Sequence, residues 1–126
     1  MGSQVIILVV DDDPLIRELN TEILIADGYQ VDAAESGAVA WDMLQLNNYD
    51  LLITDNNMPK VSGLELIQKV RAAGMALRVI MATGTPSEEE FTRCLGLQLA
   101  ATLIKPYTPV EFLETVKKVL VRSSPS

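Results

Sequence analysis

The sequence has 126 residues, of which 48% are hydrophobic and 21% are charged; this fits a single soluble globular domain, and no apolar run is long enough to span a bilayer. The net charge of −7 argues against direct binding of nucleic acid, because nonspecific nucleic-acid binders need a basic surface. With no histidine and only Cys94, the chain lacks the commonest zinc ligand and cannot form an internal disulfide, so we expect a cytoplasmic protein in which Cys94 is a small buried hydrophobe.

The first strand and helix are predicted from an apolar run and the capping residues that follow it. Residues 5–10 are apolar without polar alternation, which is typical of a central parallel strand covered on both faces. Asp13 and Pro14 then fit an N-cap and the first helical position, and Gly28 fits the helix end. The expected apolar stripe of this helix, at helical spacing, consists of Ile16, Leu19, Ile23 and Ala26.

Two more strands and one helix follow before the middle of the chain. Residues 30–34 are a strand candidate, and Ser36 is placed to cap a helix that runs to about residue 46. Residues 51–54 are again apolar and end at Asp55. Residues 56–61 should form a loop, because proline and consecutive asparagines disfavour regular structure.

The second half of the chain repeats the alternation of strands and helices. Strands are expected at residues 78–82 and 101–104. Three pairs of residues have the spacing of a capping box, which marks the start of a helix: Ser62 with Glu65, Ser87 with Glu90, and Thr108 with Glu111. Five repeats of strand then helix predict an α/β fold with a parallel sheet and helices on both faces.

This pattern defines one domain over residues 5–122. Residues 1–4 carry no basic region and no apolar signal core, so we expect no export signal and interpret them as a tail or an expression scar. Residues 123–126 have no pattern and should fray or begin a linker.

Polar residues interrupt the apolar framework just where the predicted strands end. In a parallel sheet these ends lie along one edge, and ligands of open α/β sheets bind there. The residues after the first, third, fourth and fifth strands are Asp11 and Asp12, Asp55, Thr83 and Gly84, and Lys105. The spacing therefore predicts a single site with three carboxylates, a hydroxyl and an ammonium.

The chemistry of this set favours a phosphoryl group and a magnesium ion. Three neighbouring carboxylates repel one another unless a cation joins them, and oxygen ligands suit Mg²⁺. A lysine and a threonine would suit the non-bridging oxygens of a phosphoryl group, and an aspartate can accept that group as an acyl phosphate. Asp13 is interpreted as a helix cap.

At these residues the sequence resembles the response-regulator receiver family of two-component signalling, over about residues 5–120. The resemblance implies a flavodoxin-like (βα)5 three-layer sandwich whose five parallel strands have the order 2-1-3-4-5. The motifs that carry it, in chain order, are Val9-Val10-Asp11-Asp12-Asp13-Pro14, Thr54-Asp55-Asn56-Asn57-Met58-Pro59, Ser62-Gly63, Ala82-Thr83-Gly84 and Ile104-Lys105-Pro106-Tyr107.

The resemblance also implies a role for each site residue. Asp55 would accept a phosphoryl group from a histidine kinase or a histidine phosphotransfer protein, followed by slow self-catalysed loss of the phosphate. Mg²⁺ would be bound by Asp12, Asp55 and the backbone carbonyl of Asn57, with Asp11 acting largely through water. Thr83 and Lys105 would contact the phosphoryl group, and the Lys105–Pro106 peptide would be cis.

Output would pass through the face formed by the fourth helix, fifth strand and fifth helix, to an output domain or a downstream protein. The resemblance leaves open a homodimer through the same face. Two residues depart from the family pattern: Thr102 stands where an aromatic switch residue is frequent, and Gly84 stands where alanine is common. The usual inward turn of an aromatic ring therefore cannot be carried over to this chain.

Two other functions compete with this interpretation. Residues 9–13 also resemble the haloacid-dehalogenase pattern, which would make Asp11 the nucleophile and Asp13 the acid/base of a phosphohydrolase; that hypothesis leaves Asp55 unexplained and finds no acidic pair after Lys105. A flavin-binding flavodoxin-like protein would need a phosphate loop after the first strand, where an anionic triplet stands instead.

Overall fold

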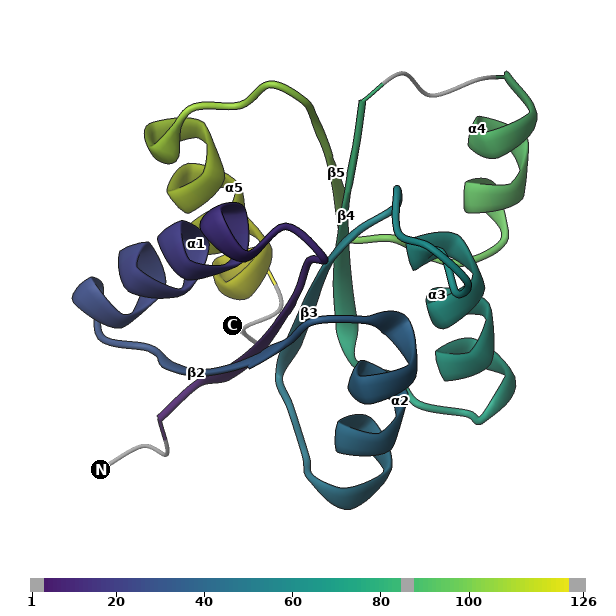
Figure 1. Cartoon of the computed structure of the whole chain (residues 1–126), viewed down its shortest axis with the longest axis horizontal. Coiled ribbons are helices and arrows are strands. Elements are labelled where there is room, and N and C mark those ends of the chain that lie inside the picture. The colour runs from purple at the N-terminus through teal and green to yellow at the C-terminus, as the bar shows by residue number, and fades with distance from the viewer. Residues whose placement is uncertain (1–3, 85–87, 123–126) are drawn as a thin grey trace.

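The computed structural model describes residues 4–84 and 88–122, which form five strands and five helices in strict alternation (Figure 1). None of the helices in these residues is long and apolar enough to cross a lipid bilayer. The strands are β1 (Ile6–Val10), β2 (Gln30–Ala34), β3 (Leu51–Asp55), β4 (Arg78–Thr83) and β5 (Ala101–Ile104). The helices are α1 (Pro14–Ala26), α2 (Gly37–Leu46), α3 (Gly63–Ala72), α4 (Glu88–Leu95) and α5 (Pro109–Arg122).

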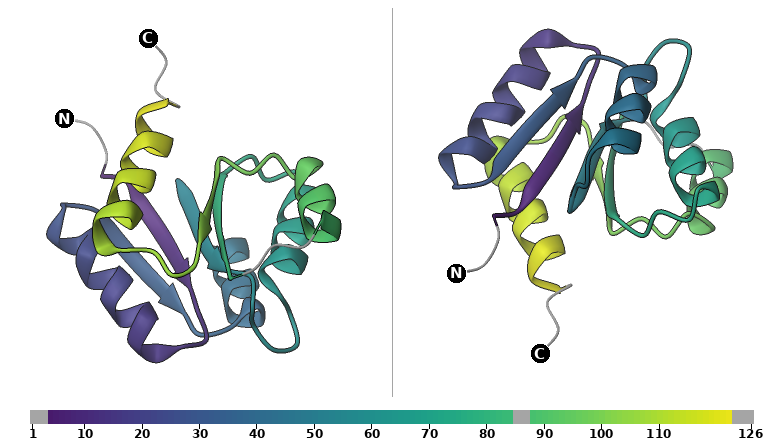
Figure 2. Two further views of the ribbon diagram at one scale, coloured as in Figure 1. Left: turned by 90° about the horizontal axis from the view of Figure 1, so that it is seen from above. Right: turned by 90° about the horizontal axis from the view of Figure 1, so that it is seen from below.

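The strands form one parallel sheet in the order β2-β1-β3-β4-β5. Helices α1 and α5 lie on one side of the sheet, and α2, α3 and α4 lie on the other, as Figures 1 and 2 show. The predicted three-layer sandwich and its strand order are thus confirmed.

Burial of the strands explains why their sequences lack polar alternation. Every residue of β3 is buried, as are nearly all residues of β1 and β4, because helices cover both faces of the central strands. The edge strands β2 and β5 are only partly buried. β3 and β4 each extend one residue beyond the predicted strand, so that Asp55 and Thr83 are the buried last residues of their strands.

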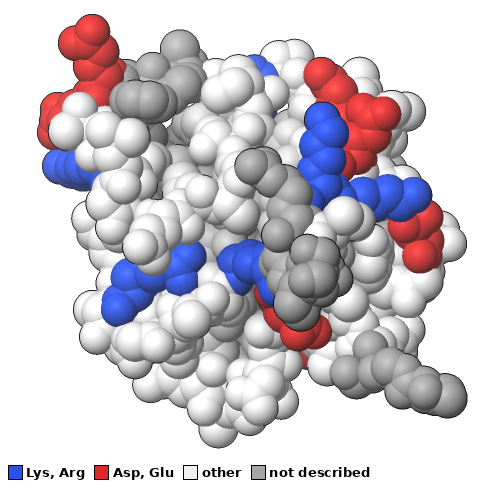
Figure 3. Space-filling model, turned by 180° about the vertical axis from the view of Figure 1, so that it is seen from behind, with Lys and Arg blue, Asp and Glu red and all other residues white. Residues whose placement is uncertain are grey.

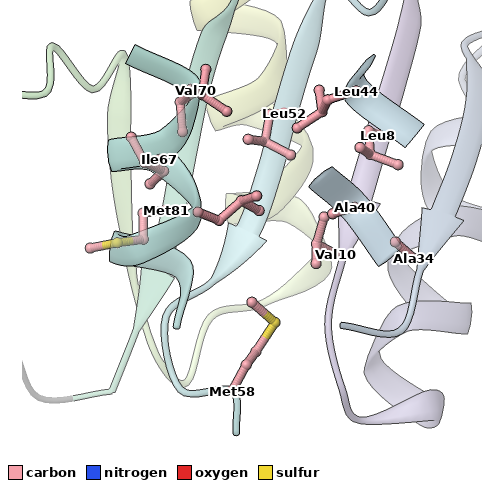
Figure 4. Close-up of a cluster of buried hydrophobic side chains, with 12 residues drawn as sticks. Leu8, Val10, Ala34, Ala40, Leu44, Leu52, Met58, Ile67, Val70 and Met81 are labelled. Atoms are coloured by element: carbon pink, nitrogen blue, oxygen red, sulfur yellow. The ribbon is translucent and has the colours of Figure 1, made fainter. Parts of the chain in front are cut away.

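Two hydrophobic clusters form the core, one on each face of the sheet. Neighbouring residues of one strand belong to different clusters, since side chains alternate between the faces of a strand. Leu8 and Val10 of β1 pack with α2 and α3, as Figure 4 shows, whereas Ile7 and Val9 pack with α1 and α5. The half-buried Cys94 packs against the first cluster.

Side-chain caps begin the helices as the sequence predicts. The Asp13 side chain accepts hydrogen bonds from the first turn of α1, and the Ser36 hydroxyl accepts one from the first turn of α2. Reciprocal capping boxes begin α3 and α5, formed by Ser62 with Glu65 and by Thr108 with Glu111. The remaining predicted capping box, Ser87 with Glu90, lies outside the residues and side chains that the structure describes.

The predicted apolar stripe of α1 is wrong at two of its four positions. Leu19 is 46% exposed and Ala26 is also exposed, while Asn20 and Leu24 are buried. The helix therefore faces the sheet along a line that contains a polar residue. Asn20 can be buried because its side-chain amide has a hydrogen-bond partner inside the protein.

At the edge of the sheet opposite the carboxyl ends, the Arg71 side chain joins two loops. Its guanidinium donates to carbonyl oxygens of the α3–β4 loop at Met75 and Leu77, and of the α4–β5 loop at Leu97 and Gln98, over 2.8–3.2 Å. Burial lowers the pKa of Arg71. One side chain thus fixes the C-terminal end of α4 to the end of α3.

Candidate functional site

The register of β1 and β3 places two aspartates side by side. Val10, the last residue of β1, pairs with Thr54 of β3, so the next residues, Asp11 and Asp55, lie at the same level of the sheet edge. Both are 4% exposed. The strand pairing itself therefore brings two carboxylates from distant parts of the sequence into one buried site.

The pairing of β4 and β5 adds the hydroxyl and the ammonium. Asp55 pairs with Ala82, and Thr83 follows as the buried last residue of β4. Thr83 pairs with Ile104, and its carbonyl oxygen accepts a 2.9 Å hydrogen bond from the backbone N–H of Lys105. The predicted juxtaposition of polar residues at the strand ends is therefore present in the structure.

Three carboxylates form a compact cluster at this edge. One oxygen from each of Asp11, Asp12 and Asp55 lies within 4.8 Å of the others. Asp12 is exposed while the other two are buried, so the cluster opens to solvent on one side. Such a group of oxygen ligands can hold a hard divalent cation.

Asp11 lies in a buried position that is unfavourable for its negative charge. Burial raises its pKa, a hydrogen bond from the backbone N–H of Asp13 to Oδ1 at 2.9 Å opposes the shift, and the negative charge of Asp55 raises it further. Asp13 itself points its carboxylate away to the start of α1, where it accepts from Leu15. The prediction that Asp13 is a helix cap is confirmed.

Lys105 neutralises Asp55 directly. Its Nζ lies 2.6 Å from Asp55 Oδ1, with the lysine side chain 31% exposed and the aspartate side chain 3% exposed. Burial alone would lower the pKa of Lys105, but the hydrogen bond and charge of Asp55, together with the charge of Asp11, raise it overall. Apart from this ion pair, the buried Oδ1 of Asp55 accepts no hydrogen bond from the described residues.

The loop after Asp55 turns tightly over the site. Gly63 lies so close that a Cβ there would come within 2.4 Å of the Asp55 carbonyl oxygen, which leaves room only for glycine. Asn56 holds the turn, because its Oδ1 accepts from the N–H of Leu64 at 2.9 Å. Asn57 is exposed in this loop, two residues after Asp55.

Residues 105–107 follow β5 directly, and the Lys105–Pro106 peptide is cis, as the family resemblance implies. Thr102, at the position of the frequent aromatic residue, is exposed on β5. Ile104, two residues further, is 51% exposed. The face of β5 that points away from the core therefore carries a threonine and an isoleucine rather than an aromatic ring.

Sequence reasoning missed two polar side chains of α1 that contact the site loops. Arg17 donates from Nη1 to the carbonyl oxygen of Asp11 at 2.8 Å, and Asn20 donates from Nδ2 to the hydroxyl oxygen of Tyr107 at 2.9 Å. A signal existed for Asn20: it lies four residues after Ile16 and four before Leu24, on one line of the helix.

Comparison with known families identifies the family to which this chain belongs. The family described as the response regulator receiver domain matches residues 7–117, which is most of the chain. The chain belongs to this family. As a receiver domain it is a signalling switch of two-component systems, as the sequence predicts, and the phosphohydrolase alternative with Asp11 and Asp13 finds no support.

Curated relatives of this receiver domain are longer proteins. The sensor histidine kinase RcsC of Escherichia coli (strain K12) is 38% identical over 119 residues, which cover 94% of this chain and 12% of the relative. The response regulator MprA of Mycobacterium sp. (strain KMS) is 37% identical over 121 residues, covering 94% of this chain and 52% of the relative. The receiver domain thus spans about half of the length of MprA and far less of RcsC.

Solved structures agree with this assignment. The CheY-like response regulator receiver domain protein of Methanospirillum hungatei JF-1 superimposes with a TM-score of 0.90 at 30% identity, covering 95% of this chain and 96% of that one. The chemotaxis protein CheY4 of Vibrio cholerae superimposes with a TM-score of 0.86 at 29% identity, covering 93% and 99%.

Proposed function

We propose that this receiver domain is switched by Mg²⁺-dependent phosphorylation of Asp55. The observation that carries the proposal is the buried Asp55 carboxylate, whose Oδ1 lies 2.6 Å from the Lys105 ammonium and beside the carboxylates of Asp11 and Asp12. An aspartate so placed lies at the sheet edge and is flanked by the charges that phosphoryl transfer needs.

The residues present fit a magnesium ion. They supply three carboxylate oxygens within 4.8 Å of one another, and the buried Oδ1 of Asp55 has the Lys105 ion pair as its only partner among the described residues. We assign Asp12, Asp55 and the Asn57 carbonyl as direct ligands, with Asp11 acting largely through water. When bound, the ion would neutralise the carboxylates and polarise the phosphoryl oxygens.

The protein's own residues then have defined tasks. An Asp55 carboxylate oxygen forms the new bond to phosphorus as the donor's bond to phosphorus breaks, and the leaving group departs with the electron pair of that bond. The Lys105 ammonium shifts from the carboxylate to a phosphoryl oxygen, and the Thr83 hydroxyl donates to another. Hydrolysis of the acyl phosphate would later restore Asp55 in a slow self-catalysed step.

The donor is a histidine kinase or a histidine phosphotransfer protein in the cytoplasm, and the domain spans residues 5–122. The face of α4, β5 and α5 would report the phosphorylated state to an output domain, a downstream protein or a second copy of the chain. Figure 3 views the side on which α5 lies and shows basic and acidic side chains interspersed with uncharged surface. With Thr102 exposed on β5, an aromatic ring at that position has no part in this output.

Mapping the modified residue tests the proposal. The protein is incubated with Mg²⁺ and a small acyl phosphate, and the labelled aspartate is identified by mass spectrometry after reduction of the acyl phosphate. Asp55→Asn should abolish labelling, whereas Asp13→Ala, which removes only a helix cap, should keep it. Label on Asp11 would overturn the assignment. Asp12→Ala should weaken Mg²⁺ binding in calorimetry, because it removes a direct ligand.

A further inference from the structure

A hydrogen bond connects α1 to the loop that carries Lys105. Asn20 is 4% exposed in the middle of α1, and its Nδ2 donates to the hydroxyl oxygen of Tyr107 at 2.9 Å. The two residues are 87 positions apart in the sequence. A buried hydrogen bond between residues so far apart in the sequence holds the loop of Tyr107 in a fixed position against α1.

Tyr107 is also held on its ring face. Its ring stacks on that of Phe112 with centroids 5.8 Å apart and planes at 17°, and Phe112 is fully buried in the core between the sheet and α5. The hydroxyl is therefore fixed by α1 and the ring by α5. Neither contact is available to an exposed loop residue, so Tyr107 is the anchor of the β5–α5 loop.

Lys105 lies between this anchor and the end of β5. Its backbone N–H donates to the Thr83 carbonyl oxygen at 2.9 Å, and Tyr107 follows two residues later. A lysine side chain has a flexible stem of four carbons, so its ammonium is placed only as well as its backbone is held. The contact of 2.6 Å between Nζ and Asp55 Oδ1 thus depends on a loop that is fixed at both ends.

We propose that Asn20 and Tyr107 form a positioning pair, whose hydrogen bond holds the Lys105 ammonium in place for phosphoryl transfer to Asp55. The inference rests on the proposed function, and neither residue contacts the reacting atoms. Arg17 strengthens the geometry, because it lies three residues before Asn20 on α1 and holds the carbonyl oxygen of Asp11. One face of α1 thus holds both the carboxylate loop and the lysine loop.

A double substitution separates positioning from stability. Asn20→Leu combined with Tyr107→Phe removes both hydrogen-bonding groups, so no buried polar atom of the pair loses its partner, and folding stability should stay near that of the wild type. Tyr107→Phe alone leaves the amide of Asn20 without a partner and should be less stable than the double variant. This order of stabilities, measured by chemical denaturation, shows that the two side chains act as a pair.

The rate of Asp55 phosphorylation by a small acyl phosphate is the first readout. We expect the double variant to react roughly tenfold more slowly than the wild type, since a displacement of about 1 Å at a reacting group can reduce rates by up to about a hundredfold. Its Mg²⁺ affinity in calorimetry should be unchanged, because the carboxylates are intact. Ile67→Val, in the core on the other side of the sheet, is a control that lowers stability without contacting this loop.

Hydrogen exchange provides a readout that needs no phosphorylation. In the double variant the amide of Lys105 should exchange faster than in the wild type, while the amide of Ile67 should not. Wild-type exchange at Lys105, or a wild-type rate of phosphorylation in the double variant, would overturn the positioning pair. If the wild type takes no label on Asp55, the proposed function is refuted instead. The exchange rate of the Lys105 amide in the double variant would still test the positioning pair.

Discussion

The electrostatic cost of the carboxylate cluster can be measured by replacing Asp11 with asparagine. Asn keeps the shape of the side chain and the Oδ1 that accepts from the N–H of Asp13, but it removes one of three negative charges whose oxygens lie within 4.8 Å of one another. Two unit charges at that distance repel by ~1 kcal/mol in water and by ~3.5 kcal/mol at an effective dielectric constant of about 20. The ammonium of Lys105 offsets part of this repulsion.

We therefore expect Asp11→Asn to raise the free energy of unfolding by about 1–2 kcal/mol in metal-free buffer at pH 7.5. The assay is urea denaturation followed by Trp41 fluorescence or circular dichroism. Asp42→Asn, on the exposed side of α2, is the matched control and should leave stability unchanged. Adding Mg²⁺ should stabilise the wild type more than the variant, because the bound cation removes the repulsion that the variant lacks.

The difference in stability between Asp11→Asn and the wild type should also depend on pH, with a defined sign. Burial raises the pKa of Asp11 in the folded protein, so its neutral form favours folding. That favourable contribution is fully present below the unfolded pKa of about 4 and is lost as the pH rises through the folded value. The stability gap between Asp11→Asn and the wild type should therefore open as the pH rises and close in acid. A gap of constant size from pH 3 to pH 8 would refute this account of the cluster.

Substitutions at three further positions have effects that follow from local geometry. Gly63→Ala should lower stability by about 1–3 kcal/mol or more in thermal denaturation, since the new Cβ would meet the Asp55 carbonyl oxygen at 2.4 Å; wild-type melting would contradict the close approach. Gln98→Gly should raise the free energy of unfolding by about 0.5–1 kcal/mol in urea denaturation, because Gln98 has a φ of 56°, which glycine adopts without steric cost; a lower stability of the variant would contradict backbone strain at Gln98. Thr108→Ala should cost about 1 kcal/mol by removing one half of the α5 capping box, and Thr108→Ser should restore most of it.

Local signals predicted the fold well because each depends on a few neighbouring residues. An unbroken apolar run such as that of β3 needs cover on both faces, and a serine three residues before a glutamate satisfies the free N–H groups of a helix start wherever the helix lies. Strand order could not be predicted in this way, since alternation of strands and helices is compatible with several orders. That part came from the family resemblance, as did the cis Lys105–Pro106 peptide.

The site was predictable as a set of residues but not as a network. Asp11, Asp55, Thr83 and Lys105 follow apolar strands, and parallel strands bring their ends together whatever the helices do. For Asn20 the sequence offers only its place on the helix line between Ile16 and Leu24; it does not show the partner, and a polar side chain is buried only when a distant group satisfies it. For the same reason, the buried stripe predicted for α1 included Leu19, which is exposed in the structure.

The bonds of Arg71 have a mechanical consequence for α4. They attach the α4–β5 loop, at the C-terminal end of that helix, to the α3–β4 loop, while the opposite end of α4 follows β4 and Thr83 at the site. Because Arg71 holds this end of α4, we expect a displacement of the other end to rotate the helix about the Arg71 hydrogen bonds rather than slide it along the sheet. If Asp55 is phosphorylated as proposed, a small movement at the site would therefore change the tilt of α4 more than the position of its C-terminal end.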